Sequence, residues 1–429
     1  MRLEVGYIFV KDTQFADKTE VKNGVLYVNK DELIKATGGD DRIASIEVFL
    51  AHPGESVRII PVKDVIEPRV KVSGPGGMFP GYLSGVEQVG SGRTHALCGA
   101  AVVTTGKIVG FQEGIIDMSG IGAEYSPFSK TNNVVVKVEP IDGLKQADHE
   151  VVVRLAGLRA AKYLGEAAKD LEPDSIRAYE TKPLLQQAAQ FPGLPKVAYV
   201  YMLQTQGLLH NTFYYGVDVK QIVPTFMYPT EAFDGAIVSG NCVSACDKNP
   251  TYVHQNSPII EDLYAEHGKT INFVGCVITN ENVTLMDKER SSEMTAKLVE
   301  HLGVDAVIIS EEGFGNPDTD LVMNCNKIEK LGIKTVLVTD EYAGQDGASQ
   351  SLADSAPING NACVTAGNAN EVITLPPMDT VMGYPEAANV IAGGWHGSLL
   401  EDGSIVTEIQ VMICSTNELG YHTLAAKEI

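Results

Sequence analysis

The sequence predicts a mixed α/β protein, with a β-rich N-terminal domain followed by an α/β domain that has a mainly parallel sheet. Two patterns carry this prediction. Up to residue 148, short apolar runs are separated by Gly and Pro, as in strands joined by turns. From residue 196, apolar runs alternate with amphipathic helical patterns, an order that favours parallel strands covered by helices. The 429 residues, 44% of them hydrophobic, suffice for more than one core.

The first domain, residues 1–148, contains apolar runs of strand length. Its expected strands are residues 2–10, 25–28, 45–50, 56–61, 70–72, 100–104 and 133–138. The glycine-rich segment 73–81 lacks the following Gly-Lys-Ser/Thr of a phosphate-binding loop, so we expect turns there. Residues 149–195 are expected to form one helix, ending before Glu172-Pro173, and then a connecting segment.

The second domain, residues 196–429, alternates strand and helix patterns. Its expected strands are 197–203, 221–227, 236–239, 271–279, 304–310 and 333–339, all in one sheet. Met294, Leu298 and Leu302 recur every fourth residue and predict a helix over 291–302. A second helix is expected to end near residue 331, where Gly332 follows.

The charge balance excludes some classes of partner. Asp and Glu number 55 against 33 Lys and Arg, a net charge of −22, which disfavours binding to nucleic acid or to an anionic membrane. The sequence has no apolar stretch of about 18 residues and no signal-peptide pattern at its start. The seven cysteines are an odd number scattered along the chain, so reduced thiols and a cytoplasmic location are expected.

Reactive side chains gather in residues 235–259. A polar loop follows the expected strand 236–239 and contains Cys242, Cys246 and His254. Ligands of open α/β sheets bind beyond the carboxyl ends of strands, which makes this loop the first candidate site. The two thiols and the imidazole do not match the common zinc spacings, and a fourth ligand is missing nearby, so no metal is expected. Taken alone, a cysteine such as Cys242 is more often a buried structural residue than a reactive centre.

The same residues resemble a known family. The motifs are Gly240-Asn-Cys-Val-Ser-Ala-Cys246, Tyr252-Val-His-Gln-Asn-Ser-Pro258, Glu311-Glu-Gly-Phe-Gly-Asn-Pro317, Lys22-Asn-Gly-Val-Leu-Tyr-Val28 and Pro61-Val-Lys-Asp-Val-Ile-Glu-Pro68. Together they resemble the α and β subunit proprotein of component B in the glycine, sarcosine and betaine reductase family, over essentially the whole chain.

The resemblance implies autocatalytic cleavage of a zymogen between Asn241 and Cys242, which converts Cys242 into a pyruvoyl group. The residues suit this chemistry. A thiol can attack the preceding carbonyl and move the acyl group from nitrogen to sulfur, which breaks the peptide bond. Elimination of the acylated sulfur then leaves dehydroalanine, which tautomerises and hydrolyses to the ketone. Gly240 and Asn241 tolerate the unusual backbone geometry that such an attack needs. His254 or Ser244 is expected to move the proton.

The resemblance also implies an oxidoreductase of amino acid fermentation that acts within a hetero-oligomer. The pyruvoyl group forms a Schiff base with glycine, which lets a selenolate of a partner displace ammonia. The implied partners are the selenoprotein γ subunit of component B, the selenoprotein component A, component C, which forms acetyl phosphate, and indirectly the thioredoxin system. No metal or nucleotide is implied.

Several alternatives stay open at this stage. The substrate can be sarcosine instead of glycine, whereas betaine, a quaternary amine, cannot condense with a ketone. The chain can also be an unprocessed scaffold that docks the selenoprotein. Cys246 and Tyr252 are further candidates for processing or substrate binding. Asn316, at an expected helix start, either caps the helix or helps to hold the substrate carboxylate.

Overall fold

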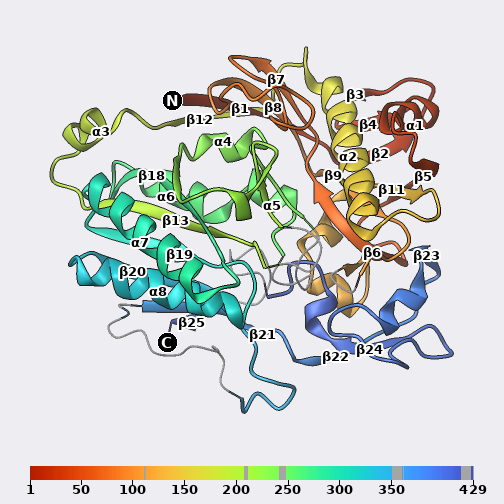
Figure 1. The fold of residues 1–429 in the computed structure, drawn as a ribbon. Helices are drawn as coiled ribbons and strands as arrows, with labels where there is room; N and C mark the ends of the chain where they lie inside the picture. The colour runs from red at the N-terminus through yellow and green to blue at the C-terminus, as the bar shows by residue number, and fades with distance from the viewer. Residues whose placement is uncertain are drawn as a thin grey trace.

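The computed structural model describes residues 1–110, 113–206, 211–240, 248–349, 360, 362–416 and 427–428. Within these residues the chain forms three larger sheets, with helices packed on them (Figure 1). The mixed α/β class expected from the sequence is confirmed.

Two of the larger sheets lie in the first half of the chain. The four-stranded sheet has the order β12-β1-β8-β7. Its strands are β1 (Arg2–Phe9), β7 (Arg69–Ser73), β8 (Gly92–Cys98) and β12 (Ser175–Glu180). The next sheet has the order β10-β6-β9-β11-β5. Its strands are β5 (Ile43–Ala51), β6 (Val57–Ile66), β9 (Ala100–Thr105), β10 (Gly114–Asp117) and β11 (Asn132–Pro140). A small sheet is formed by β2 (Asp12–Phe15), β3 (Glu20–Lys22) and β4 (Val25–Val28).

Strand β6 is the centre of the first half, because all ten of its residues are buried. Its charged side chains are paired in the interior. Arg58 donates two hydrogen bonds of 2.7 Å to Asp117, and Lys63 donates one of 2.7 Å to Glu113. Buried charges are tolerated only when they are paired in this way, so β6 holds a fixed position.

The eight α-helices and six 3₁₀ helices of the described residues cover the sheets. They are α1 (Lys30–Thr37), α2 (Gln146–Gly165), α3 (Leu184–Gln190), α4 (Thr230–Phe233), α5 (Thr251–Gln255), α6 (Pro258–Glu266), α7 (Leu285–Leu302), α8 (Asn316–Lys330), η1 (Ile121–Glu124), η2 (Pro127–Lys130), η3 (Glu166–Ala168), η4 (Val219–Gln221), η5 (Pro385–Asn389) and η6 (Ile409–Val411). Helix α2 lies along β9 and β11 (Figure 1). Gly157 allows its close approach, because a Cβ atom there would lie 2.5 Å from the Thr104 methyl group.

The third large sheet has the order β16-β18-β13-β19-β20-β21-β25. Its strands are β13 (Lys196–Leu203), β16 (Thr225–Met227), β18 (Asn272–Asn280), β19 (Ala306–Ser310), β20 (Lys334–Glu341), β21 (Ala362–Asn368) and β25 (Lys427–Glu428). The five strands from β18 to β21 are mutually parallel. Strand β13 comes first along the chain but lies between β18 and β19 in the sheet. The chain adds β18 on one side of β13 and β19 on the other, so the direction in which strands are added reverses between β13 and β19.

Some elements differ from the expectations. Strand β17 (Ile237–Val238) does not join the parallel sheet but pairs with β14 (Phe213–Tyr214), which pairs with β15 (Val217–Asp218). Its two residues are too short a run to reveal their partner in the sequence. In α7 the buried side chains are mainly small, including Ser292, Thr295 and Ala296, whereas the expected stripe of Met294, Leu298 and Leu302 is only partly buried.

The C-terminal part returns to the first half. Strand β23 (Thr380–Gly383) pairs in parallel with β6. Strands β22 (Val372–Leu375) and β24 (Ile405–Glu408) form a separate antiparallel pair. Together with α2 on the N-terminal sheet, these contacts link segments far apart in sequence. The domain limits at 148 and 195 stay a prediction.

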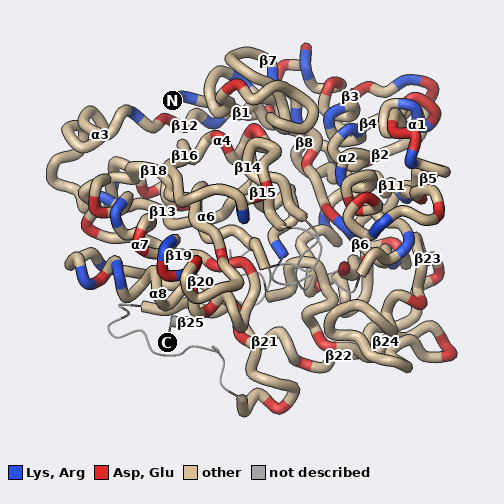
Figure 2. Tube along the Cα trace, in the orientation of Figure 1, with Lys and Arg blue, Asp and Glu red and all other residues tan. Residues whose placement is uncertain are grey.

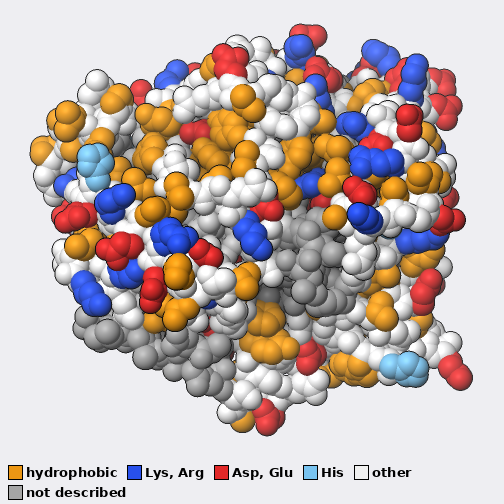
Figure 3. Space-filling view, in the orientation of Figure 1, with side chains coloured by type: hydrophobic (Ala, Val, Ile, Leu, Met, Phe, Trp, Pro, Cys, Tyr) orange, Lys and Arg blue, Asp and Glu red, His pale blue; other side chains and the backbone are white. Residues whose placement is uncertain are grey.

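Acidic and basic side chains are interspersed over the face seen in Figures 2 and 3, and the basic side chains do not cluster into one patch on this face. Figure 3 also shows hydrophobic side chains collected in the upper part of this face, over the region of α4. No helix among the described residues is long and apolar enough to cross a membrane.

Candidate functional site

The chain is held on both sides of the expected cleavage junction. Asn241, Cys242, Ser244 and Cys246 lie outside the described residues. Just before them, Ser239 and Gly240 are buried after β17, and the backbone N–H of Ser239 donates a 3.1 Å hydrogen bond to Oγ1 of Thr251. One hydroxyl of α5 thus contacts the chain directly before the junction.

Strand β6 anchors the chain directly after the junction. Thr251 donates two hydrogen bonds to the carboxylate of Asp64, one of 2.9 Å from its backbone N–H and one of 2.7 Å from its hydroxyl. The buried ammonium of Lys248 donates to the carbonyl of Lys63. Burial raises the pKa of Asp64, and the charge of Lys248 acts in the opposite direction.

His254 is fully buried on α5 between two polar partners. The Tyr201 hydroxyl lies 2.6 Å from its Nδ1, and Oε1 of Glu312 lies 3.4 Å from its Nε2. The Tyr201 contact is a short hydrogen bond, whereas Nε2 makes no hydrogen bond within the described residues and has the Glu312 carboxylate nearby. Tyr201 thus orients the imidazole, and Glu312 lies close enough to pair with the ring when it is protonated, an arrangement that suits an acid–base group.

Glu312 stands where the order of the parallel sheet reverses. Its Oε2 accepts hydrogen bonds of 2.8 Å from the backbone N–H of Gln204 and 2.9 Å from the Thr212 hydroxyl. Gln204 directly follows β13 and Glu312 follows β19, so the contact with Glu312 places the buried His254 near the carboxyl ends of these two strands. Crevices at such reversals are the usual ligand sites of open α/β sheets.

Two further carboxyl groups lie at the same edge. The backbone N–H of Glu312 donates a 2.9 Å hydrogen bond to Glu281, the residue after β18. Burial raises the pKa of Glu281 well above its ordinary value, and the neighbouring charge of Glu312 acts in the same direction. The pKa of Glu311 is also raised well above its ordinary value, first by burial and then by Asp318. Both groups are therefore biased towards the neutral, proton-carrying form.

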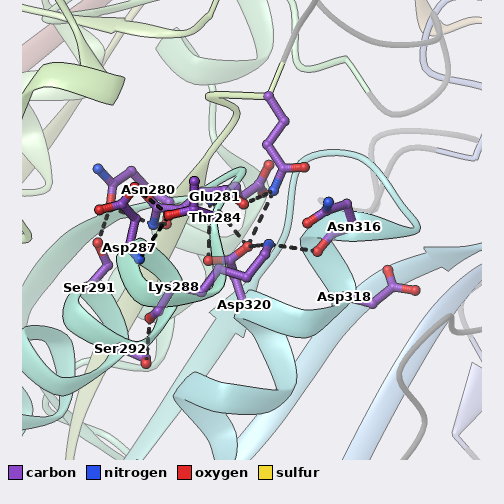
Figure 4. Close-up of polar contacts among 12 residues, drawn as sticks. Asn280, Glu281, Thr284, Asp287, Lys288, Ser291, Ser292, Asn316, Asp318 and Asp320 are labelled. Atoms are coloured by element: carbon purple, nitrogen blue, oxygen red, sulfur yellow. Dashed lines mark hydrogen bonds and ion pairs between the residues drawn. The ribbon is translucent and has the colours of Figure 1, made fainter.

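Asn316 lies beside a buried ion pair (Figure 4). It is the exposed first residue of α8, and its carbonyl accepts a 2.8 Å hydrogen bond from Lys288. The same ammonium pairs with Asp320. The expected cap is supplied by Asp318, which accepts a 3.1 Å hydrogen bond from the backbone N–H of Gly315, instead of by the Asn316 side chain.

Tyr252 is one of the packing residues of the site. Its ring meets Phe128 edge to face, with centroids 5.2 Å apart. Asn256 in the same motif accepts a 2.6 Å hydrogen bond from the buried Arg69. The described residues contain no group of three His, Cys, Asp or Glu side chains that could hold a metal ion.

Tyr201 and Glu312 are the contacts that sequence reasoning did not assign. Glu312 lay within the quoted Glu311–Pro317 motif, but its pairing with a histidine 58 positions earlier depends on the fold. A usable signal was present in the polar residues found within two positions of the ends of apolar strands, namely Gln204, Glu281 and Glu312.

The comparisons with known proteins show the family to which the chain belongs. A model of the family described as "Glycine/sarcosine/betaine reductase component B subunits" matches residues 1–427. The chain belongs to this family. It is 65% identical over 429 residues to "Glycine reductase complex component B subunits alpha and beta" of Acetoanaerobium sticklandii, with all of both chains covered. No solved structure matches.

Two other relatives of this component B chain are informative. It is 59% identical over 427 residues to "Sarcosine reductase complex component B subunit alpha" of Peptoclostridium acidaminophilum, with both chains fully covered. It is 21% identical over 357 residues to "D-proline reductase proprotein PrdA" of Acetoanaerobium sticklandii, a match that covers 78% of this chain and 54% of that protein.

Asp320 gives the site a pH-dependent stability. Burial raises its pKa to about 6, although Lys288 acts in the opposite direction. Between pH 4 and pH 6 the folded chain therefore holds a proton that the unfolded chain releases, so the unfolding free energy declines by roughly 3 kcal/mol as pH rises. Asp320→Asn removes this decline. Measured by urea unfolding, the unfolding free energy of the variant relative to that of the unsubstituted chain should therefore rise by roughly 3 kcal/mol between pH 4 and pH 7.

Asp287→Asn on α7 is the matched control, because the pKa of exposed Asp287 is lowered by hydrogen bonds from Thr284 and Arg290. Its relative stability should change with pH in the opposite sense. A relative loss for Asp320→Asn as pH rises would mean that Lys288 dominates and that the pKa of Asp320 is lowered.

Proposed function

We propose that this chain is the substrate-activating component B subunit of a glycine reductase, and that Cys242 is the precursor of its pyruvoyl group. The observation that carries the proposal is the full-length match at 65% identity to the glycine reductase component B α and β chain. The name "proprotein" of the D-proline reductase relative supports a chain that is cut before it acts. The chain would act as an oxidoreductase within a complex.

The surroundings of the junction fit a buried ketone. Gly240 and Lys248, the described residues on its two sides, are buried, and so are Thr251 and His254 behind them. Low water access protects an electrophilic carbonyl and strengthens the hydrogen bonds around it. When formed, the pyruvoyl carbonyl would condense with the amine of glycine and withdraw electrons from the bond between Cα and nitrogen.

His254 supplies the proton transfer in this proposal. Its ring is oriented by Tyr201 and Glu312, and its helix is tied by Thr251 to Ser239, two residues before Asn241. Cleavage needs a base for the Cys242 thiol, and release of ammonia needs an acid for the departing nitrogen. A histidine that is hydrogen-bonded at one ring nitrogen and faces a carboxylate with the other can take up and return one proton.

The remaining parts of the reaction follow the family. A selenolate of a partner selenoprotein would attack the activated carbon, and further components would form acetyl phosphate and use reductant from the thioredoxin system. We place the chain in the cytoplasm, in a hetero-oligomer with the selenoprotein γ subunit, component A and component C. Ser244, Cys246, Tyr252 and Asn316 remain candidates for processing or substrate binding.

Cleavage is tested most directly at Cys242. Cys242→Ala should remain one chain and be inactive, because the methyl group cannot attack the Asn241 carbonyl. In native-host enzyme, intact mass spectrometry should find fragments 1–241 and 242–429, and borohydride with labelled glycine should tag the start of the second fragment. Cys276→Ala, at a buried cysteine of β18, is the control and should still be cut.

An active full-length chain with a free Cys242 thiol would instead indicate the scaffold role.

The role of His254 is tested by substitutions that keep its packing. His254→Gln should slow either cleavage or ammonia release by about 10²–10⁴-fold, the usual contribution of a positioned acid–base group. Glu312→Gln should shift the pH profile of the same step, because it removes the charge that faces Nε2. His52→Gln, at a partly exposed histidine, is the control and should match the unsubstituted chain. An unchanged rate and pH profile in both site variants would assign His254 to structure alone.

Sarcosine is the second candidate substrate, supported by the 59% identity to the sarcosine reductase chain. Its secondary amine can also condense with a ketone. We expect amine release from glycine to be faster than from sarcosine when the chain is assayed with the purified partner components. If methylamine is released from sarcosine but no ammonia is released from glycine, sarcosine is the substrate, and the proposed chemistry at Cys242 is unaffected.

A further inference from the structure

An aromatic pocket outside the junction is not used by the proposed function. It has a volume of about 390 Å³ and is lined by Phe314, Tyr342, Ala392, Gly393, Gly394, Trp395, Glu408 and Gln410. Phe314 follows β19 and Tyr342 follows β20, whereas Glu408 ends β24. The volume lies within the range of small-molecule sites.

Three aromatic side chains, Phe314, Tyr342 and Trp395, line this pocket. Phe314 and Tyr342 are stacked in parallel, with centroids 4.1 Å apart and an interplanar angle of 10°. No ligand fits between rings at this distance, so a ligand must contact the outer surface of the pair. Tyr342 and Trp395 are 41% and 39% exposed, which leaves aromatic surface open to an incoming molecule. Such faces are negative and attract cations.

Glu408 adds a full negative charge. It accepts hydrogen bonds from three neutral amides, at 2.9 Å from Gln345, at 3.1 Å from Asn370, and from Gln410. Among the described residues no basic side chain forms an ion pair with Glu408, and none lines the pocket. The amides hold the carboxylate in place without neutralising it, so the pocket repels anions and favours a cation.

We propose that this pocket binds an alkylammonium group, with its carbon substituents against the rings and its positive charge facing Glu408. A neutral apolar ligand would place no positive charge opposite the carboxylate of Glu408. A bare metal ion would find one carboxylate where it needs several oxygen ligands. The group can belong to a small amine or to a lysine side chain of a partner. The proposal does not depend on cleavage at Cys242.

Trp395 is a built-in reporter, because it is the single tryptophan of the chain. Choline should change its fluorescence saturably at constant ionic strength. The neutral isostere of choline, 3,3-dimethylbutan-1-ol, should bind at least tenfold more weakly. Methylammonium and N-acetyl-lysine amide then separate the sources, since tighter binding of the lysine analogue indicates a partner side chain and tighter binding of methylammonium indicates a small amine.

Two substitutions test the two halves of the pocket. Glu408→Gln keeps the shape and removes the charge, and it should weaken choline binding at least tenfold. Phe314→Leu keeps the carboxylate and should also weaken binding. Glu401→Gln, at an exposed position before β24, is the matched control and should bind as the unsubstituted chain does. Equal affinity for the neutral alcohol, an unaffected Glu408→Gln variant, or the absence of a saturable signal would overturn the proposal.

Discussion

The hydrogen bonds between Asp64 and Thr251 are the contact on which the candidate site depends. They join the fully buried strand β6 to helix α5, and the same Thr251 hydroxyl accepts from Ser239 before the junction. Strand β6 cannot shift easily, because its charges are paired in the interior with Asp117 and Glu113. The chain therefore reaches the junction from one fixed point and leaves it from another, and His254 is placed three residues beyond the second.

A second constraint is the cost of burying carboxyl groups at the strand ends. Glu281 and Glu311 are buried away from water, which raises their pKa values and favours the protonated form of each carboxyl group. Glu312 differs, because it accepts two hydrogen bonds through one oxygen and faces His254 with the other. In the proposed reaction ammonia departs with its bonding electrons and needs a proton. An edge that combines neutral acids with an oriented imidazole can supply one.

Much of the fold could be predicted because it rests on local patterns. The long apolar runs form strands β6, β13, β18 and β19, as predicted. The alternation of apolar runs with amphipathic helices begins at residue 196, where β13 of the parallel sheet starts. Helix α1 and strands β8 and β10 were among the elements that were missed, and the expected connecting segment before residue 196 contains β12 and α3. Strand β17 was assigned to the wrong sheet, since two residues carry no periodicity. In the candidate site, the motif predicted a role for His254, which stays a prediction, whereas Tyr201 and Glu312 approach this histidine only through the order of the sheet.

The strand order of the large parallel sheet also indicates how the two fragments of a cleaved chain could stay associated. Strand β13 precedes the junction, yet it lies between β18 and β19, which both follow it. Likewise β23, near the end of the chain, pairs with β6. Cleavage after Asn241 would break one peptide bond outside these strands and leave every hydrogen bond of these pairs intact. Separating the fragments would instead expose both edges of β13, whose side chains are almost all buried, so association is the favoured state.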